Sequence, residues 1–582
     1  MKYPTLPTQA SGRETVEYFK GYNHNLRIAS GEAFDMWNMT SDYFPVMSPR
    51  SERGVYATPA SPQGILAKDN LCYVDGTCMV IGTERVEMGL STKASDCPKQ
   101  LISMGAYIIV MPDKKYINTL DTGDFGSIEA SFVSEGEVSF EMCNVDGESY
   151  EGATIAANAP ENPKNLDYWI DTSTTPHALK RYSSNSGEWT AVGTTYVKIG
   201  AEGIGEHFKQ YDSVTISGIA IEQLKTLNAS ATIWGCGKDY IIIVGVLDAV
   251  TSQKTAVTVE RRMPNLDFVI ESENRLWGCR YGTAANGETV NEIYACKLGD
   301  FKNWNCFMGL STDSYVASCG TDGPFTGAIT HLGYPLFFKE NCIHKVYGNY
   351  PKNYQIQTST CRGVQKGCHN SLAIANETLY YKARGAVCAY DGSLPVEVSS
   401  ALGNEAYSDA TAGAVGNKYY ISMKNAAGEW NLFAYDTAKK MWHKEDDLQA
   451  SAFCAHHGEM YCIDRRNMNI ITLFGSGSKE TEPVEWMWQT GELGISSPDM
   501  KYISGITVRM MLERGSMVDF YIQYDQSEEW EHICNIRGTA LRSFNVPIRP
   551  RRCDHMKLRI VGIGGGKVYS FSKTISQGSG LS

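Results

Sequence analysis

Short runs of apolar or alternating residues, separated by turns that contain Gly, Asp or Asn, make up most of the chain. Leu71–Val74, then Asp75-Gly76, then Cys78–Ile81 have the pattern of a tight hairpin, because Asp-Gly supplies the positive φ angles that a two-residue turn requires. Amphipathic helical periods are scarce, so the pattern predicts an all-β chain. The same scheme recurs at Ala106–Val110 with Tyr116-Ile117, Leu379–Tyr381 with Cys388–Tyr390, and Lys418–Ser422 with Leu432–Asp436.

The spacing of these hairpins indicates a repeated unit. They recur about every 30 to 45 residues, which is the period of a β-propeller blade. Tyr435-Asp436-Thr437 followed by Trp442 is similar to the end of a kelch-type blade. The stretch from about residue 61 to residue 475 is therefore predicted to be a β-propeller of about seven blades.

The spacing lengthens between residues 126 and 228. This stretch holds a loop rich in Pro and Asn, Asn158–Pro163, and two further strand patterns, Tyr168–Asp171 and Trp189–Val192. Blade-like sequence resumes at Ala231–Gly235. We therefore expect a small β domain, 126–228, inserted between propeller segments 61–125 and 229–475, since loops tolerate long insertions.

The two ends of the chain have different patterns. After a linker at 476 to 482, the runs Ile503–Arg509, Met517–Tyr524 and Met556–Val561 alternate with period two. Each would bury one face, which predicts a C-terminal β-sandwich over 476–582. The turn-rich residues 1–60 are expected to form an extended N-terminal arm.

Composition supports a globular chain of several domains. Its 582 residues are 42% apolar and 20% charged, with 33 Tyr, 19 Phe, 11 Trp and 55 Gly, which favour strands and turns. The N-terminus has no secretory pattern, and no apolar run is long enough to span a bilayer. The 17 Cys have no zinc-type spacing and are expected to be buried free thiols.

Charge singles out one stretch near the C-terminus. The formal net charge of −12 disfavours a surface that grips nucleic acid throughout. Between Arg537 and Lys573, however, nine Lys and Arg accompany Asp554 as the single carboxylate. This stretch could be a solvated strand face, a surface that docks a protein, or a surface that faces DNA.

No pattern of residues in the sequence indicates a catalytic or metal-binding site. A glycosidase would need a pair of carboxylates, but the candidates lie in or beside turns, where Asp bonds to the backbone. A second set, of His and Asp, lacks the spacing of metal ligands, and Gly562–Gly566 precedes a strand pattern rather than the helix of a phosphate loop. The sequence predicts no catalytic residue, no cofactor and no metal, and hence no enzyme. The carboxylates are Asp391, Glu397 and Asp436, and the second set is His443, His456, His457, Asp446 and Asp464.

Several motifs spread over nearly the whole chain carry a family resemblance. They are Phe34–Met39 with Tyr43–Arg50, Arg275–Cys279, Ile293–Asp300, Leu332–Glu340 and Ile548–His555. Together they resemble structural proteins of phages and prophages from Gram-positive hosts, related to the tail nozzle (tail tubular) and stabilisation proteins of short-tailed phages. The resemblance implies a propeller-based subunit packed in a ring around the DNA channel.

The leading hypothesis is therefore a structural component of a bacteriophage tail or head–tail assembly, made in the host cytoplasm and resident in the virion tail. Its partners would be other tail or connector proteins and further copies of itself in a ring, with DNA passing through without sequence-specific binding. Arg549, Arg551, Arg552 and Lys557 are the candidate docking residues, because Arg pairs well with carboxylates on a neighbour.

Two alternatives remain open. In the first, the inserted domain recognises a host glycan through Tyr168, Trp169 and Trp189, unless these aromatic residues form the domain's own core. The second is a propeller glycosidase.

Overall fold

The computed structural model describes residues 11–577 except 151, 175–176, 247–250, 285–286, 480–481 and 497–498. The regular structure of these residues is β-strand apart from six short 3-10 helices, which confirms the predicted all-β class. Among them no helix has the length and apolar character that crossing a membrane would require. The helices are η1 (Ala94–Asp96), η2 (Ile204–Glu206), η3 (Glu222–Leu227), η4 (Pro351–Asn353), η5 (His369–Ser371) and η6 (Ser400–Leu402).

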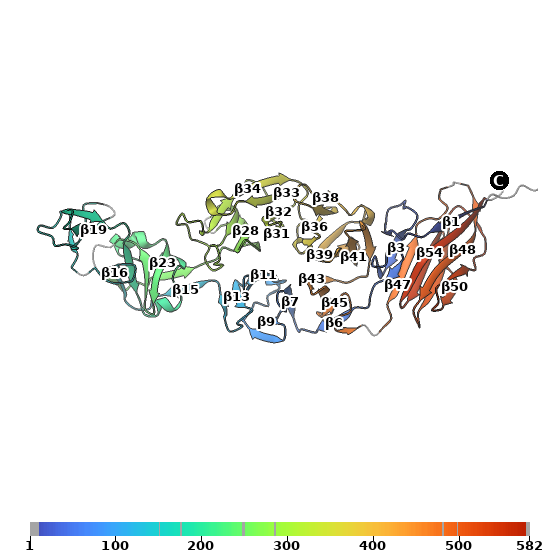
Figure 1. Cartoon of the computed structure of the whole chain (residues 1–582), viewed down its shortest axis with the longest axis horizontal. Coiled ribbons are helices and arrows are strands. Elements are labelled where there is room, and N and C mark those ends of the chain that lie inside the picture. Colours follow the sequence, from blue (N-terminus) through green and yellow to red (C-terminus); the bar gives the residue numbers. More distant parts are fainter. Residues whose placement is uncertain are drawn as a thin grey trace, which may run out of the picture.

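The middle of the molecule consists of antiparallel sheets that follow one another along the chain, which we call the central ring (Figure 1). Three of these sheets precede residue 320. They are β7 (Pro62–Ala67), β8 (Leu71–Asp75), β9 (Cys78–Ile81) and β10 (Glu84–Glu87); β11 (Gln100–Met104), β12 (Tyr107–Met111), β13 (Lys115–Asn118) and β14 (Phe125–Ser127); and β27 (Phe268–Ser272), β28 (Arg275–Thr283), β29 (Thr289–Ala295) and β30 (Tyr315–Ser318).

The other sheets of the central ring come later in the chain. They are β31 (Gly327–His331), β32 (Tyr334–Lys339), β33 (Cys342–Tyr347) and β34 (Gln355–Thr360); β35 (Ala373–Ala375), β36 (Thr378–Ala383), β37 (Ala386–Tyr390) and β38 (Val396–Glu397); β39 (Tyr407–Val415), β40 (Lys418–Asn425), β41 (Trp430–Asp436) and β42 (Met441–Lys444); and β43 (Ala450–His456), β44 (Glu459–Asp464), β45 (Ile470–Thr472), β6 (Gly54–Ala57) and β46 (Ser478–Lys479).

The first strands of these sheets contact one another in a closed order. β7 contacts β11, β11 contacts β27, and β27 contacts β31. The helix η5, just before β35, contacts β31, and β35 contacts β39. β39 then contacts β43, and β43 contacts β7, which closes the circle. The last sheet is completed by β6, which comes from the N-terminal side of the ring.

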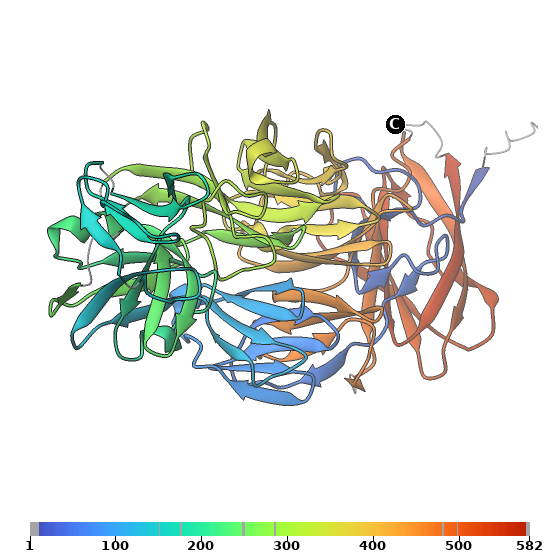
Figure 2. The same cartoon turned by 60° about the vertical axis from the view of Figure 1, so that its left-hand side comes forward.

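A second body, which we call the insert, projects from one end of the central ring (Figures 1 and 2). One sheet has the order β15-β26-β22-β23-β24-β21-β16-β25, and a smaller one contains β17 to β20. Their strands are β15 (Ala130–Val133), β16 (Val138–Cys143), β17 (Thr154–Ala156), β18 (Tyr168–Asp171), β19 (Ala178–Ser183), β20 (Glu188–Ala191), β21 (Tyr196–Gly200), β22 (Ser213–Ser217), β23 (Ser230–Gly237), β24 (Tyr240–Val244), β25 (Thr251–Gln253) and β26 (Thr258–Arg261).

The insert extends further along the chain than its sequence pattern suggested. The run Ala231–Gly235, expected to resume the propeller, lies in β23 and pairs with β22 and β24 of the insert. The blade-like pattern is local and is the same in both bodies, whereas the pairing partners differ. The chain returns to the central ring at β27, so the insert ends near residue 261 rather than 228.

The opposite end of the molecule contains two sheets with a shared core. One has the order β1-β54-β48-β51, with β52 also on β48, and the other ends in β47-β53-β49-β50. Trp486, Val508, Phe520 and Phe571 belong to the core cluster between them. The strands are β1 (Ser11–Val16), β47 (Glu485–Thr490), β48 (Lys501–Leu512), β49 (Met517–Tyr524), β50 (Glu531–Arg537), β51 (Arg542–Val546), β52 (Arg552-Cys553), β53 (Met556–Ile563) and β54 (Gly566–Gln577).

The N-terminal segment differs from the expected extended arm. β1 pairs with β54, while β2 (Gly21-Tyr22) and β3 (Glu32–Trp37) lie between β42 and β47. They complete one ten-stranded sheet that runs from the central ring into the C-terminal sheets. A Cβ at Gly21 would collide with the carbonyl oxygen of Trp442 on β42, so glycine permits this close approach. The segment continues through β4 (Met39-Thr40) and β5 (Ser48-Pro49).

Candidate functional site

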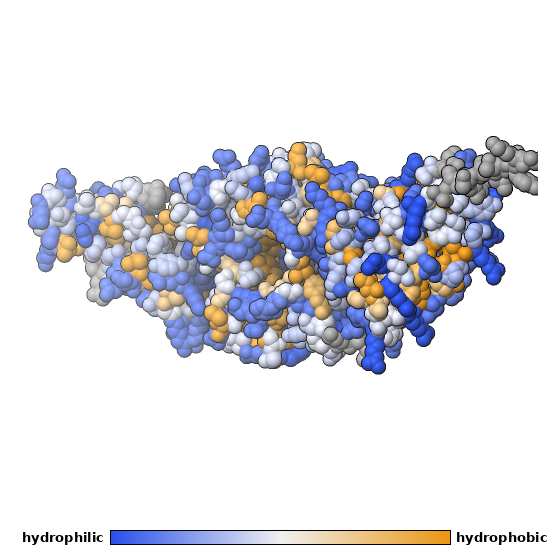
Figure 3. Space-filling model, turned by 45° about the vertical axis from the view of Figure 1, so that its right-hand side comes forward, coloured by the Kyte–Doolittle hydropathy of each residue, from blue (hydrophilic) through white to orange (hydrophobic). Residues whose placement is uncertain are grey.

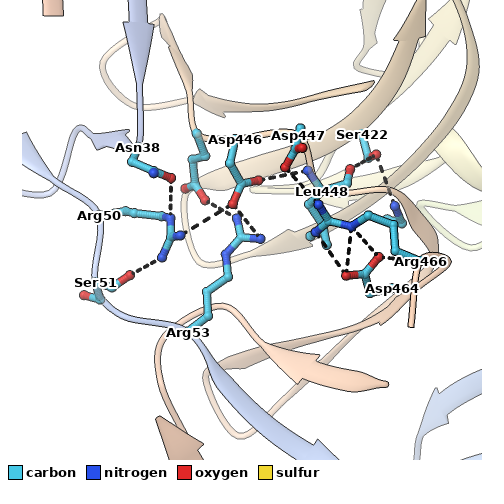
Figure 4. A network of polar contacts seen from close by, with 12 residues as sticks. Asn38, Arg50, Ser51, Arg53, Ser422, Asp446, Asp447, Leu448, Asp464 and Arg466 are labelled. Carbon is cyan, nitrogen blue, oxygen red and sulfur yellow. Dashed lines mark hydrogen bonds and ion pairs between the residues drawn. The ribbon is translucent and has the colours of Figure 1, made fainter. Parts of the chain in front are cut away.

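A buried network of charged residues, which we call the joint, lies where the N-terminal segment meets the central ring (Figure 4). The guanidinium of Arg53 contacts Glu445 Oε2 at 3.1 Å and Asp446 Oδ2 at 2.9 Å. Arg50 contacts the same oxygen of Asp446 at 3.5 Å and donates to Asn38 Oδ1 at 2.7 Å. Burial raises the pKa of Glu445, and the positive charge of Arg53 opposes that rise. Buried ion pairs of this kind are stable only where each charge has a compensating partner.

A second group of contacts extends the joint along the same segment. Lys418 on β40 donates to Asp42 Oδ1 at 2.6 Å and to Thr40 Oγ1 at 2.8 Å. Ser41 Oγ donates to Asp436 Oδ2 at 2.6 Å, so a carboxylate considered as a glycosidase candidate has a structural partner. The N-terminal segment is thus held to the central ring by side chains as well as by sheet pairing.

The candidate docking residues divide into two groups. Arg549, Arg551 and Arg552 are exposed on the segment between β51 and β53. Arg551 contacts Glu531 at 2.9 Å, and both side chains are more than half exposed. Lys557 lies apart on β53, with its ammonium 5.8 Å from the centre of the Phe34 ring. The structure therefore brings three of the four arginine and lysine candidates together on one surface segment.

The aromatic residues proposed for glycan binding pack inside the insert. Trp169 is buried, donates its Nε1–H to the Ala156 carbonyl at 2.9 Å, and forms an edge-to-face pair with Trp189. Tyr168 pairs with Tyr150 at a centroid distance of 4.7 Å. These contacts favour a role in the insert's own packing.

The other sequence candidates are also dispersed. Asp391 Oδ1 accepts from the amide and the hydroxyl of Ser393, as turn residues commonly do. Glu397 pairs with Arg362 at 2.8 Å. His443 is buried, and burial lowers its pKa to about 3. Within the described residues no group of three or more His, Cys, Asp and Glu is arranged to hold a metal ion.

A cavity of about 230 Å³ lies between the first strands of the central ring. The face in Figure 3 is hollowed near the middle of the molecule, where apolar residues line the depression. The residues that line the cavity are a mixture of apolar and polar ones, with Lys99 and His369 as the titratable side chains and no carboxylate among the described residues. Lys99 itself pairs with Asp113 at 2.5 Å. This cavity therefore lacks the paired carboxylates that glycoside hydrolysis requires.

A larger cavity, of about 420 Å³, lies between the insert and the central ring. Glu129 and Glu260 contribute carboxylates, but each is already paired, with Lys114 at 2.8 Å and with Arg262 at 2.6 Å. Trp304, Phe307 and Tyr294 supply aromatic surface. The arrangement can hold a polar molecule against aromatic rings, but both carboxylates have structural partners.

Comparisons with known proteins do not assign the chain to a family. No protein-family model matches it, and no curated protein matches its sequence. One similar solved structure is U3-55K, with 7% identity and a TM-score of 0.25 over 66% of this chain and 99% of that one. Another is a mutant sialidase of Trypanosoma rangeli, with 9% identity and a TM-score of 0.22 over 73% of this chain and 96% of that one. An exo-β-1,3-galactanase of Phanerochaete chrysosporium is also similar, with 8% identity and a TM-score of 0.20 over 52% of this chain and 94% of that one. TM-scores this low carry no argument for a reaction.

These comparisons nevertheless correct one expectation. The prediction that the chain is not an enzyme is contradicted, because its structural neighbours include a sialidase, a galactanase and a further glycoside hydrolase. The prediction is withdrawn.

Proposed function

We propose that the chain is a structural subunit of a bacteriophage tail or head–tail assembly and forms part of a ring or conduit through which DNA passes. Its architecture would be a seven-bladed β-propeller with an inserted β domain and a C-terminal β-sandwich. The closed order of contacts from β7 through β43 back to β7 supports the blade count. The last sheet of the central ring is completed by β6, which comes from the N-terminal side of the ring, so this sheet joins the two ends of the ring. Such a closure supports a propeller as well.

The observation that carries the functional proposal is the joint. Two of the segments that resemble phage tail proteins, Phe34–Met39 and Tyr43–Arg50, contribute Asn38 and Arg50 to it. They supply β3, which continues the sheet from one body to the next, and Arg50, which contacts Asp446. A subunit that must keep a fixed shape in a ring requires such a connection, because interfaces between domains otherwise permit relative motion.

The exposed segment with Arg549, Arg551 and Arg552 is the proposed contact with a neighbouring tail protein. The chain carries a net charge of −12, so copies of it offer carboxylates to such a segment. The segment lies in the body at the end of the molecule, away from the insert (Figure 1). That position favours a peripheral contact, and the acidic remainder of the chain would let DNA slide rather than bind it.

The experiment is the double substitution Arg551→Glu and Arg552→Glu in a phage complementation assay. We expect particle assembly to fail while the purified subunit keeps its circular dichroism spectrum and unfolding midpoint, because exposed charges contribute little to stability. The matched control is Lys238→Glu with Lys254→Glu, which makes the same charge change on exposed residues of the insert.

Two results would count against the proposal. Normal assembly with a defect confined to DNA ejection would assign the segment to the lumen. A virion reconstruction that places the labelled subunit as a single peripheral copy would exclude a ring or conduit.

A further inference from the structure

A cavity of about 610 Å³ opens between the sheet of β31–β34 and the sheet of β35–β38. Its volume is within the range of sites that bind small molecules. Its walls come from turns and strand ends between residues 322 and 384. The lining includes Asp322, Thr326, Lys339, Glu340, Lys366 and Arg384.

Lys339 is a buried cation without a carboxylate partner among the described residues. Its side chain is at the end of β32 and only 1% of the residue is exposed. The ammonium donates to Asn291 Oδ1 at 2.9 Å and to the Thr321 carbonyl at 2.8 Å, and it lies 4.7 Å from the centre of the Phe325 ring. An ammonium has three protons to donate, so one remains after these two bonds.

The charge of Lys339 affects its surroundings, and the nearby carboxylate of Asp322 compensates it only in part. Burial lowers the pKa of Lys339 itself. Burial, together with the charge of Lys339, lowers the pKa of nearby His344 to about 4, so this histidine is neutral at physiological pH. A buried cation held by neutral acceptors and rings is costly unless an anion accompanies it.

Thr326 supplies a second, independent polar group in the wall of the cavity. The residue is buried, with 2% exposed, and its Oγ1 has no hydrogen-bond partner. Buried hydroxyls are almost always satisfied, so an exception requires an explanation. An oxygen of a bound ligand would accept this proton.

The rim of the cavity adds further positive charge. Lys366 and Arg384 are exposed, and neither side chain forms an ion pair with a described residue. Arg362 also lines the cavity, but Glu397 compensates its charge at 2.8 Å. The carboxylates of Asp322 and Glu340 oppose these cations, and Glu340 Oε1 accepts the backbone N–H of Lys366 at 3.1 Å. The lining thus has four cations against two carboxylates, in a chain whose net charge is −12.

We propose that this cavity binds an oxyanion, the carboxylate or phosphate group of a small acidic ligand. The guanidinium of Arg384 and the ammonium of Lys366 would contact the anion from the rim, and the Thr326 hydroxyl and the Lys339 ammonium would contact it from the wall. The ligand that carries this oxyanion is either an acidic sugar or a phosphate. This inference is independent of the proposed tail function, because the site needs no second copy of the chain.

The test is calorimetric titration of the full chain with inorganic phosphate and, separately, with glucuronate at low ionic strength. We expect Arg384→Gln to weaken binding about tenfold, the usual effect of losing a charge-assisted hydrogen bond. Thr326→Val should also weaken binding while raising the unfolding midpoint without ligand, because it removes an unsatisfied buried hydroxyl. Lys352→Gln is the control, since Lys352 is an exposed cation beside the same sheet and outside the cavity lining.

Comparing the affinities for the two ligands shows whether the site prefers an acidic sugar or a phosphate. Binding of glucuronate that exceeds binding of phosphate assigns the site to acidic sugars, the reverse assigns it to phosphates, and equal binding assigns it to oxyanions in general. Failure of both ligands to bind at millimolar concentration would overturn the proposal. So would binding that Arg384→Gln and Thr326→Val leave at the level of Lys352→Gln.

Discussion

Removal of Arg53 tests whether the joint holds the N-terminal segment to the central ring. Arg53 and Glu445 each expose only 6% of their side chains, and Asp446 exposes 11%. The substitution Arg53→Met keeps the aliphatic stem but leaves two buried carboxylates without their nearest cation. Breaking a buried pair in this way costs about 3–5 kcal/mol of unfolding free energy.

The pH dependence of this loss identifies its cause. Burial already raises the pKa of Glu445 in the folded state, and without Arg53 the pKa rises further. Between its unfolded pKa, about 4.3, and this higher folded value, the folded protein binds more protons than the unfolded one. The free energy of unfolding therefore falls as pH rises through that window. The deficit of Arg53→Met should be smaller at pH 5 than at pH 8.

The assay is urea unfolding followed by tryptophan fluorescence, which reports both sides of the joint. Trp442 lies in the central ring, and Trp486 and Trp488 lie in the C-terminal sheets. We expect the single transition of the natural chain to separate into two in Arg53→Met, since bodies that lose their connection no longer unfold together. The control is Arg262→Met, whose side chain is 72% exposed in its pair with Glu260 and whose loss should cost less than about 1 kcal/mol.

Two outcomes would refute the reasoning. A loss below about 1 kcal/mol in Arg53→Met would mean that the pair behaves as a surface ion pair. An equal loss at pH 5 and pH 8 would mean that Glu445 is not the group left uncompensated.

Two other predictions concern the insert and the buried histidines. Replacing residues 130–261 by a short Gly-Ser linker should leave a soluble chain with its cooperative unfolding, because Glu129 Oε1 accepts the Met263 amide at 3.1 Å and the two ends are adjacent. Removing 126–228 instead should give an insoluble chain, since β23 to β26 would lose their partners β15, β16, β21 and β22, and size-exclusion chromatography would show the difference. Burial lowers the pKa of His344 to about 4 and that of His443 to about 3, so unfolding free energy should fall by about 2 kcal/mol per histidine as pH drops from 6.5 to 5. Urea titrations of His344→Gln should show a weaker pH dependence over that range, and an unchanged slope would contradict the assignment.

Local sequence patterns were sufficient to predict the hairpins. Leu71–Val74 and Cys78–Ile81 lie in β8 and β9, but the turn between them is Gly76-Thr77 rather than the predicted Asp75-Gly76, with a positive φ of 63° at Gly76. The alternation in Met517–Tyr524 likewise became β49, with buried and half-exposed residues in turn. Both predictions rest on neighbours in the chain, since turn chemistry and period-two burial are local properties.

Long-range pairing could not be predicted in this way. β1 pairs with β54 at the far end of the chain, and β2 inserts beside β42. β2 is only two residues long, and β3 buries its side chains in no strict alternation, so neither shows a period-two signal. Gly562–Gly566 precedes a strand, as its sequence pattern predicts, but the chain crosses there from one sheet to the other, which no local pattern indicates.

The sequence indicates one of the two cationic surfaces, the segment with the three arginines, more clearly than the other, the cavity lined by Lys366 and Arg384. The reason is again that only neighbours in the chain form a recognisable pattern. Arg549, Arg551 and Arg552 are nearly contiguous, so their charge is evident in the sequence, whereas Lys366 precedes β35 and Arg384 lies in the turn between β36 and β37, so only the folding of this sheet brings them to one cavity. Lys339 did carry a local signal: it follows Leu336, Phe337 and Phe338 directly in one strand. A run that is apolar at consecutive positions predicts a strand buried on both faces, and a lysine continuing such a strand must be buried as well. Because a buried lysine needs polar partners, a lysine at the end of a continuous apolar strand indicates a buried polar contact, as Lys382 does with Gln365 in the next sheet.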